Sequence, residues 1–522
     1  MATSPGEAGR CSLMAKIVVI GAGIGGLSVA ARLSRGGHEV SVYEASDRSG
    51  GKCRTEWFGD YAFDTGPSLL TLPAVYRDLF RKTGKRVELL LKFQPVDPAF
   101  DYHFADGVQL TFPNLSLPQI CEEIELKLGK PAADEWHRLM QRAERMWDVA
   151  REPFVESELA SLPTLLRRKN FLRDLKMISP LTSLRKLSAT YTPNPYLSKI
   201  IDRYATYSGS DPRKVPAVLL TIAFVESSFG AWHIEGGIGQ LSTAIEERAR
   251  ALGTEFHFNT SIKSITHANG VATGVVTEDG QKISADFVIA NADAEIVYNQ
   301  MLEKDVAIVK KERKKLRRAE KSLAGFTLML GLDNSKIADA VPKLNHHNVY
   351  FPENYDLEFD EIFALKKPVT DPTIYICAPS DPTMVRGENK EAWFVLVNAP
   401  RHEPVSGWDW NNGGAEYAQA LIAKLDQLGL RVSERLDVME FRTPLDLQNS
   451  VGAPGGSIYG TSSNGSQSAF LRASNRSPLK NLFCVGGSAH PGGGLPLVGI
   501  SAEIVANAIG EMPGTNPMHS RH

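Results

Sequence analysis

The segment Lys16-Ile17-Val18-Val19-Ile20-Gly21-Ala22-Gly23-Ile24-Gly25-Gly26-Leu27 decides the fold of this chain. Its first five residues form an apolar, β-branched run, which is typical of a strand buried on both faces of a parallel sheet. The glycines then have separate roles. Gly21 permits a tight turn, Gly23 lets the backbone approach a pyrophosphate, and Gly26 lets a helix pack close to the sheet. The N-terminus of that helix is expected to face the phosphates with free N–H groups.

A second strand and an acidic residue strengthen the prediction of a dinucleotide site. The run Glu39-Val40-Ser41-Val42-Tyr43 is typical of a buried strand. Glu44 at its end can accept hydrogen bonds from both hydroxyls of a ribose, and its charge argues against the 2′-phosphate of NADP. The residues assigned to this part of the site are Gly21, Gly23, Ile24, Gly25, Gly26, Glu44 and Ala45.

The next segment, Arg48-Ser49-Gly50-Gly51-Lys52, predicts a second pass of backbone over the pyrophosphate. Gly50 and Gly51 would supply the close approach, and Arg48 and Lys52 would offset the negative charge. The alternative is a basic surface loop. A further tight turn is expected at Phe63-Asp64-Thr65-Gly66-Pro67-Ser68, and Gly66 within it is expected near the ring system of the cofactor. Asp64 either belongs to that site or serves only as a turn cap.

The end of the chain carries a second glycine-rich stretch. Asn481-Leu482-Phe483-Cys484-Val485-Gly486-Gly487-Ser488 predicts a strand and turn, and His490-Pro491-Gly492-Gly493-Gly494-Leu495-Pro496 follows. Gly486 and Gly487 are expected to lie against a ribityl-phosphate chain. The helix that contains Leu497 is expected to direct its N-terminus at a flavin ring. A chain that begins and ends on one dinucleotide is expected to hold it permanently, which favours FAD over a nicotinamide.

Composition sets the remaining limits. With 522 residues the chain is expected to form two domains. A hydrophobic content of 43% and a charged content of 23% are ordinary for a soluble globular protein. The net charge of −2 gives no basis for a nucleic-acid partner. The five cysteines lack paired spacing, which indicates neither a disulfide framework nor a zinc site and fits a reducing compartment. No metal is expected, and neither a signal core nor a membrane-spanning run is evident.

These motifs resemble the two-dinucleotide-binding flavoproteins, and among them the bacterial-type phytoene desaturase family. The resemblance rests on Phe63–Ser68, on Trp232–Leu241 and on His490–Pro496, and it extends from Lys16 to about Gly510. The Gly-Gly-Gly-Leu-Pro form at Gly492 is similar to that of later-acting members, the 3,4-desaturases of acyclic carotenoids and the C30 carotenoid oxidases. The resemblance implies an FAD-dependent enzyme that desaturates an acyclic carotenoid by hydride transfer to the flavin. It also implies that the backbone near Ile262 contacts the adenine side.

Other functions of the same scaffold stay open at this point. They are carotenoid oxidation, cis–trans isomerisation, and non-catalytic transport of prenyl lipids. Amine oxidation is disfavoured because the segment around Gly492 offers no paired aromatic residues for the flavin.

The expected fold class is α/β, with a Rossmann-like FAD-binding domain of the amine-oxidase type and an inserted α+β substrate domain. The FAD domain is discontinuous and comprises residues 14–86, 236–300 and 475–512. The substrate and membrane-associating domain comprises residues 87–235 and 301–474. Residues 1–13 are expected to be flexible and residues 513–522 disordered.

Catalytic and membrane-binding residues are less clearly marked. An allylic cation beside a polyene is internally delocalised, so strong acid–base residues are less necessary, and the only candidates are His490 and His233. Each has the alternative of a structural histidine. The basic stretch Leu165–Lys186 predicts a helix on an anionic lipid surface, or else a helical lid. The expected location is cytoplasmic, on the inner face of the membrane, with a hydrophobic polyene as substrate and quinone or dioxygen as electron acceptor.

Overall fold

A parallel sheet built from distant parts of the chain lies at the centre of the dinucleotide half of the molecule. The computed structural model describes residues 14–159, 171–340, 343–466, 468 and 472–511. The sheet has five strands in the order β19-β13-β1-β2-β9. The strands are β1 (Lys16–Ile20), β2 (Glu39–Tyr43), β9 (Glu255–His257), β13 (Phe287–Ala290) and β19 (Leu482–Cys484). Their order brings the beginning, middle and end of the chain together.

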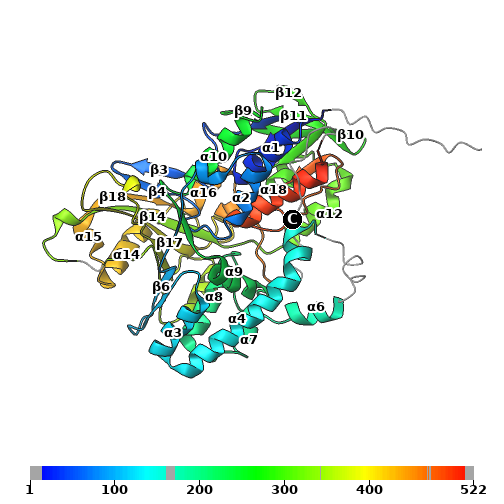
Figure 1. Ribbon diagram of the computed structural model, residues 1–522. Helices are drawn as coiled ribbons and strands as arrows, with labels where there is room; N and C mark the ends of the chain where they lie inside the picture. The colour runs from blue at the N-terminus through cyan, green and yellow to red at the C-terminus, as the bar shows by residue number, and fades with distance from the viewer. Residues whose placement is uncertain (1–13, 160–170, 341–342, 467, 469–471, 512–522) are drawn as a thin grey trace, which may run out of the picture.

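Both faces of this sheet are covered. Ile17 and Val19 pack into a cluster with three helices, and Val18 and Ile20 pack into a cluster with a three-stranded sheet. Successive side chains of a strand point to opposite faces, so an entirely apolar β1 suits a sheet buried on both sides. The helices are α1 (Ile24–Arg35), α10 (Gly239–Arg250) and α18 (Leu495–Ile509), and the small sheet contains β10 (Ile262–Ala268), β11 (Val271–Thr277) and β12 (Lys282–Ser284). Figure 1 shows α18 beside α1.

The second half of the molecule is built on a mixed sheet of seven strands in the order β18-β14-β17-β16-β15-β6-β7. Strand β6 pairs with β15 in parallel, and the other neighbours are antiparallel. The long apolar strands β14 and β17 are interior neighbours in this sheet. The strands are β6 (Phe100–His103), β7 (Gln109–Phe112), β14 (Ala324–Asp333), β15 (His347–Tyr350), β16 (Ile374–Cys377), β17 (Lys390–Ala399) and β18 (Leu436–Arg442).

Helices cover this sheet and extend away from it. One apolar cluster joins β6 and β7 to a helical layer, in which the Trp136 side chain is 1% exposed. In Figure 1 this layer lies at the end of the molecule far from α1. Its helices are α3 (Leu117–Leu128), α4 (Lys130–Arg151), α8 (Pro195–Thr206) and α9 (Thr221–Phe229). Further helices are α2 (Ala74–Lys82), α6 (Phe171–Ile178), α7 (Leu184–Ser188), α12 (Lys310–Arg318) and α14 (Gly414–Gln427).

A short hairpin connects the two halves. Strands β3 (Thr55–Phe58) and β4 (Tyr61–Asp64) pair with each other, and β4 packs on β17. Tyr61 and Phe63 are fully buried in a cluster with Met329 and Phe394. The segment that follows the second pass of glycines is therefore fixed against the seven-stranded sheet.

The predicted α/β fold class is confirmed, and the described strands include those expected around the glycine motifs. The division into two domains stays a prediction. Residues 1–13, 165–170 and 513–522, for which flexible ends and part of a basic helix are predicted, lie outside the described residues. Among the described helices, none combines the length and the apolar character needed to cross a bilayer.

Candidate dinucleotide site

The first glycine turn and the second glycine pair pack directly on each other. Gly21 has a φ of +91°, and its N–H donates to the carbonyl of Tyr43 at 2.7 Å. The N–H of Gly50 donates to the carbonyl of Ala22 at 2.8 Å. A Cβ atom at Gly51 would lie 3.2 Å from the Cα of Gly23, so the two backbones leave no room for side chains. The second glycine segment therefore lies directly against the first turn, and its contact with a pyrophosphate stays a prediction.

Asn291 joins the first and last glycine turns, a role that sequence analysis did not assign. It follows β13, and its Nδ2 atom donates to the carbonyl of Gly21 at 3.3 Å. Its Oδ1 atom lies 2.6 Å from the positions that a Cβ atom would take at Gly25 and at Gly486. Only glycine at these positions leaves space for the amide, so Asn291 fixes the spacing of the two turns. A polar residue directly after a buried parallel strand was the available signal.

Replacement of Asn291 by leucine is expected to weaken FAD binding about tenfold, because the hydrogen bond to Gly21 is lost and the two turns separate. Replacement by aspartate is expected to weaken binding further, because a carboxylate would repel the pyrophosphate. Titration of the apoprotein with FAD measures both dissociation constants. Values within about twofold of wild type for both variants would show that Asn291 has no part in the site.

Glu44 is held at the edge of the first turn, where it was predicted to bind a ribose. Its Oε2 atom accepts a hydrogen bond from the N–H of Ala22 at 2.6 Å. Its Oε1 atom accepts from the N–H and the hydroxyl of Ser46 at 2.9 and 2.8 Å. Ala45 between them is exposed, and the carbonyl of Glu44 accepts from the N–H of Thr260 at 2.8 Å. Ile262, predicted near the adenine, lies two residues further on and is buried at the start of β10.

Two helices direct uncapped N-termini toward this region. Helix α1 begins after Gly23 and α18 begins after Gly494, and neither has a side-chain cap or an acidic residue in its first turn. Ile24 and Gly25 are buried in the first turn of α1, and Leu497 lies in the first turn of α18. Uncapped N–H groups favour an anionic ligand. The close-packed glycines, the carboxylate of Glu44 and these helix ends fit an FAD molecule.

The basic residues of the second segment mostly hold the protein's own backbone. Arg48 is largely exposed and pairs with Glu56 at 3.3 Å. Arg54 donates to the carbonyl groups of Ser49 and Arg48 at 3.0 and 2.8 Å. The Lys52 ammonium is half-buried and donates to the carbonyl of Ile458 at 2.7 Å. That Arg48 and Lys52 offset the negative charge of a pyrophosphate stays a prediction.

The segment Ser457–Thr461, which we call the strap, crosses the C-terminal glycine turn. The ring of Tyr459 packs on Gly493 so closely that a Cβ atom there would overlap it. Arg472 holds the strap from the other side, with its guanidinium donating to the carbonyls of Tyr459, Thr461 and Gly487 at 3.0, 2.8 and 2.8 Å. Tyr459 therefore places an aromatic ring at the turn, although the glycine segment itself contains none.

Asp64 and Gly66 stabilise the turn that leads toward the seven-stranded sheet. A Cβ atom at Gly66 would overlap the carbonyl oxygen of Lys52, so this turn packs on the second glycine segment. The Oδ1 atom of Asp64 accepts hydrogen bonds from the Thr55 hydroxyl at 2.6 Å and from the N–H of Ile238 at 2.9 Å. Asp64 is 6% exposed, and it caps the turn that precedes α10. Burial raises the pKa of Asp64 to about 6, against the opposing effect of these two hydrogen bonds.

This raised pKa predicts a pH dependence of stability. The carboxyl ionises near pH 3.8 in the unfolded chain and near 6 in the folded protein. Between these values the unfolded state loses the proton first, so the free energy of unfolding falls as the pH rises. Asp64→Asn is expected to make the loss of stability between pH 4 and pH 7 smaller by about 3 kcal/mol. Urea unfolding at both pH values measures this, and parallel pH profiles for the two proteins would contradict it.

The two predicted catalytic histidines are both buried and both hydrogen-bonded. His490 is 3% exposed, and its Nε2–H donates to the carbonyl of Ser157 at 2.9 Å. Burial lowers the pKa of His490, with a smaller contribution from Arg472 in the same direction. His233 is 7% exposed and bonds the Oδ2 atom of Asp381 at 2.8 Å. In each ring Nδ1 is the nitrogen left to accept a proton, and the catalytic roles stay predictions.

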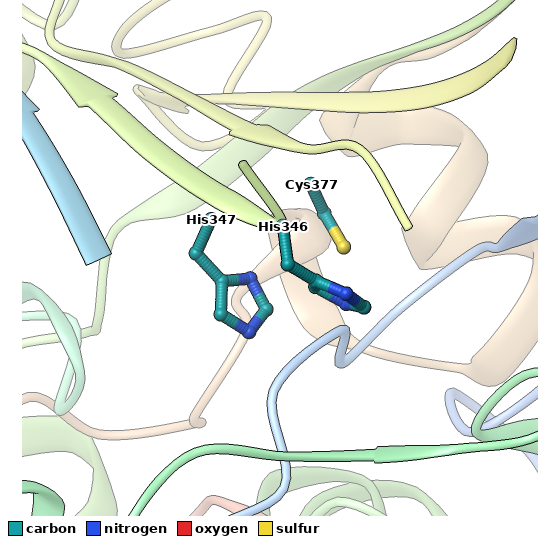
Figure 2. A group of neighbouring side chains, drawn as sticks. All are labelled: His346, His347 and Cys377. Carbon is teal, nitrogen blue, oxygen red and sulfur yellow. The ribbon is translucent and has the colours of Figure 1, made fainter. Parts of the chain in front are cut away.

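A polar cluster connects the turn after β4 to the seven-stranded sheet. Figure 2 shows His346, at the entry to β15, close to His347 of β15 and Cys377 of the adjacent β16, with ligand atoms within 4.8 Å of one another. The Tyr375 hydroxyl bonds the Nδ1 atom of His347 at 2.8 Å and the Ser68 hydroxyl at 2.9 Å. Burial lowers the pKa of His346 to about 3, so its imidazole is neutral. The hydrogen bonds that run from Ser68 through Tyr375 to His347 give the cluster a structural role, because they join the two halves of the molecule.

Comparison with known proteins identifies the family of this chain. The model of the family of flavin-containing amine oxidoreductases matches residues 24–324. The 1-hydroxycarotenoid 3,4-desaturase of Flavobacterium sp. (strain P99-3) is 32% identical over 96% of this chain and 100% of its own length. The 4,4'-diapolycopene oxygenase of Methylomonas sp. is 29% identical over 95% of this chain and 98% of its own.

Among solved structures, an oxidoreductase from Methanosarcina mazei superposes with a TM-score of 0.63 at 16% identity. The superposition covers 94% of this chain and 100% of that protein, so the two share a fold. The family match includes the first helix of the glycine motif, the second glycine segment and β13 with Asn291. This chain therefore belongs to the family of flavin-containing amine oxidoreductases, and its cofactor is FAD.

Proposed function

We propose that this enzyme desaturates an acyclic carotenoid, a phytoene-like compound or a later C30 or C40 intermediate, in carotenoid biosynthesis. The observation that carries the proposal is similarity along nearly the whole chain to a carotenoid desaturase, at 32% identity. The apolar strands β14 and β17 of the seven-stranded sheet are consistent with a long hydrocarbon ligand.

Desaturation removes a hydride and a proton from adjacent saturated carbons. When bound, FAD supplies the hydride acceptor. The glycine turns and the uncapped helices α1 and α18 would bind and orient it, and Glu44 would hold its ribose. The proton would pass to Nδ1 of His490, whose Nε2–H is already engaged by the Ser157 carbonyl. His233 beside Asp381 is the second candidate. Quinone or dioxygen would accept the electrons afterwards.

Replacement of His490 by alanine is expected to lower the rate of polyene desaturation about tenfold, with FAD still bound. The effect is modest for a general base because the polyene itself delocalises the developing charge. Single-turnover flavin reduction measured with the polyene substrate separates this step from reoxidation. A rate equal to that of the wild type would show that the histidine is structural, as its bond to Ser157 allows.

Pigment analysis tests the reaction itself. The protein is expressed in hosts that make phytoene, neurosporene or C30 precursors, and the masses of the pigments are measured. A loss of two hydrogens per step is the expected result. An unchanged mass with altered geometry would indicate an isomerase, and a protein without flavin would indicate a lipid carrier.

Carotenoid oxidation is the second candidate function. The similarity to 4,4'-diapolycopene oxygenase, at 29% identity over 95% of this chain, favours it. In the same expression hosts it would appear as a gain of oxygen by the pigment.

We further propose that the enzyme works on the cytoplasmic face of a membrane, where a water-insoluble polyene is available. The described part of the predicted basic helix, α6, presents Arg173 and Lys176 to solvent, and Leu181 beyond it is 89% exposed. Arg142 fixes this helix to α4 by donating to the carbonyl of Met177 at 2.6 Å. Exposed cations beside an exposed leucine suit an anionic lipid surface.

Charge reversal at Arg167, Arg168 and Arg173 is expected to reduce flotation with anionic vesicles. Neutral vesicles serve as the comparison, since electrostatic attraction should be lost on them for both proteins. Unchanged binding of the reversed variant to anionic vesicles would exclude this helix as the anchor.

A further inference from the structure

Two cations lie close to the C-terminal glycine turn without an ion-pair partner. Arg472 is 6% exposed and donates only to backbone carbonyls, those of Tyr459, Thr461 and Gly487. Lys52 donates to the carbonyls of Ile458 and Ser457 at 2.7 and 3.5 Å. Among the described residues, no carboxylate forms an ion pair with the side-chain nitrogens of either cation, which donate to backbone carbonyls instead. Burial of these charges lowers the stability of the folded protein, because a buried charge normally requires a counter-charge.

The contacts of Arg472 fix its guanidinium against the C-terminal glycine turn. The Gly487 carbonyl that it binds belongs to the turn predicted to meet the ribityl-phosphate chain. Its Cζ atom lies 3.8 Å from the position of a Cβ atom at Gly492, so it packs on both limbs of the turn. Burial lowers the pKa of Arg472 to about 10, and Asp293 acts in the opposite direction. The guanidinium therefore stays charged at neutral pH.

Asp293 is the only acid among the described residues that acts electrostatically on both cations. It is half-buried at the start of α11 (Ala294–Ile296), and its Oδ1 atom accepts from the N–H of Glu295 at 2.8 Å. Its influence opposes the burial-driven lowering of the pKa of Lys52 as well as that of Arg472. Two cations against one carboxylate leave a net positive charge around the turn.

We propose that Arg472 is a positioning residue that also tunes the flavin: it holds the strap over the glycine turn, and its uncompensated charge favours the reduced cofactor. Reduction adds negative charge to the ring system, and a nearby buried cation stabilises that form more than the oxidised one. The charge of Lys52 also favours the reduced flavin, whereas the charge of Asp293 favours the oxidised flavin. This inference concerns the FAD cofactor and does not depend on the identity of the polyene.

The midpoint potential of the bound flavin tests the proposal without any polyene substrate. For Arg472→Gln, the ratio of reduced to oxidised flavin at a given potential is expected to fall about tenfold, which is about 30 mV for a two-electron couple. Arg472→Lys keeps the positive charge, so its ratio of reduced to oxidised flavin is expected to stay within about threefold of the wild-type ratio. Lys480→Gln removes an exposed charge from the same segment and should leave the ratio unchanged.

Asp293→Asn provides a test of opposite sign. Asparagine keeps the cap on Glu295 but removes the negative charge, so the ratio of reduced to oxidised flavin is expected to rise about tenfold. This variant also decides the matter if Arg472→Gln fails to fold. Potentials that remain at the wild-type value in both Arg472→Gln and Asp293→Asn would overturn the charge role. Equal losses of thermal stability in Arg472→Gln and Arg472→Lys with unchanged potentials would leave Arg472 only a structural clamp on the strap.

Discussion

Gly26→Ala is expected to yield a protein that retains less than about a tenth of the wild-type flavin and whose free energy of unfolding is lower by about 3 kcal/mol or more. A Cβ atom at Gly26 would overlap the carbonyl oxygen of Gly21. That oxygen belongs to the turn itself and cannot rotate aside as a side chain can. The helix would have to move away from β1, and its N–H groups would lose the position in which they are predicted to meet the pyrophosphate.

The ratio of absorbance at 450 nm to that at 280 nm in the purified protein measures flavin retention, and urea unfolding measures stability. Gly253→Ala is the matched control, because Gly253 has a φ of +94° but open space around it. This substitution is expected to lower the free energy of unfolding by about 1 kcal/mol and to leave the flavin content unchanged. Gly23→Ala is a milder variant, since its Cβ atom would meet the side-chain amide of Asn291 at 2.9 Å and no backbone atom. Full flavin content in Gly26→Ala would refute the predicted packing of this helix on the turn.

Glu226→Ala is expected to lower the free energy of unfolding by about 3–5 kcal/mol, because it leaves Arg203 as an uncompensated buried cation. The two side chains are 6% and 5% exposed and lie 3.2 Å apart. The hydroxyls of Tyr204 and Tyr207 donate to the Glu226 carboxylate at 2.6 and 2.9 Å. The network therefore fastens α8 to α9.

Aromatic rings complete this network. The Arg203 guanidinium lies 4.5 Å from the ring centroid of Phe100 and 4.9 to 5.3 Å from three tyrosine rings. Phe100 and Tyr102 belong to β6, the strand next to the edge, so the same cation also fastens the helices to the seven-stranded sheet. Loss of Glu226 would leave these contacts in place but without the charge that balances them.

Urea unfolding followed by tryptophan fluorescence measures the change. Glu434→Ala serves as the control, because Glu434 pairs with Arg431 on the surface and should have no measurable effect. The double variant Arg203→Met with Glu226→Leu is expected to be more stable than Glu226→Ala, since no buried charge remains. A loss below about 1 kcal/mol in Glu226→Ala would show that water or another group neutralises Arg203.

The glycine motifs and the strands beside them were predictable from the sequence for a local reason. An apolar β-branched run, a tight turn and a helix are encoded within a few neighbouring residues, as in Lys16–Leu27. The same holds for the hairpin of β11 and β12, whose turn at Asp279-Gly280 is evident from the residues alone. The FAD cofactor followed because each glycine has a defined steric task in such a turn.

Contacts between distant segments were not predictable in this way. Asn291 was not assigned to the dinucleotide site from the sequence, whereas in the structure it holds the turns at Gly21 and Gly486 together. Asp64 was left between two roles, and the structure shows that it caps the turn at Ile238. The ring of Tyr459 reaches Gly493 from a separate segment. The residues that neighbour them in the sequence do not predict which distant residues they contact.

By itself, the sequence determined the α/β class, the FAD cofactor and the chemistry that a flavin supplies, because those properties depend on short patterns of residue type. Only the tertiary structure decided which side chains surround the glycine turns and with what charge. Arg472 next to Gly487, His490 against Ser157 and Glu226 against Arg203 arise when burial removes water and leaves each polar group to the partner that the fold brings near.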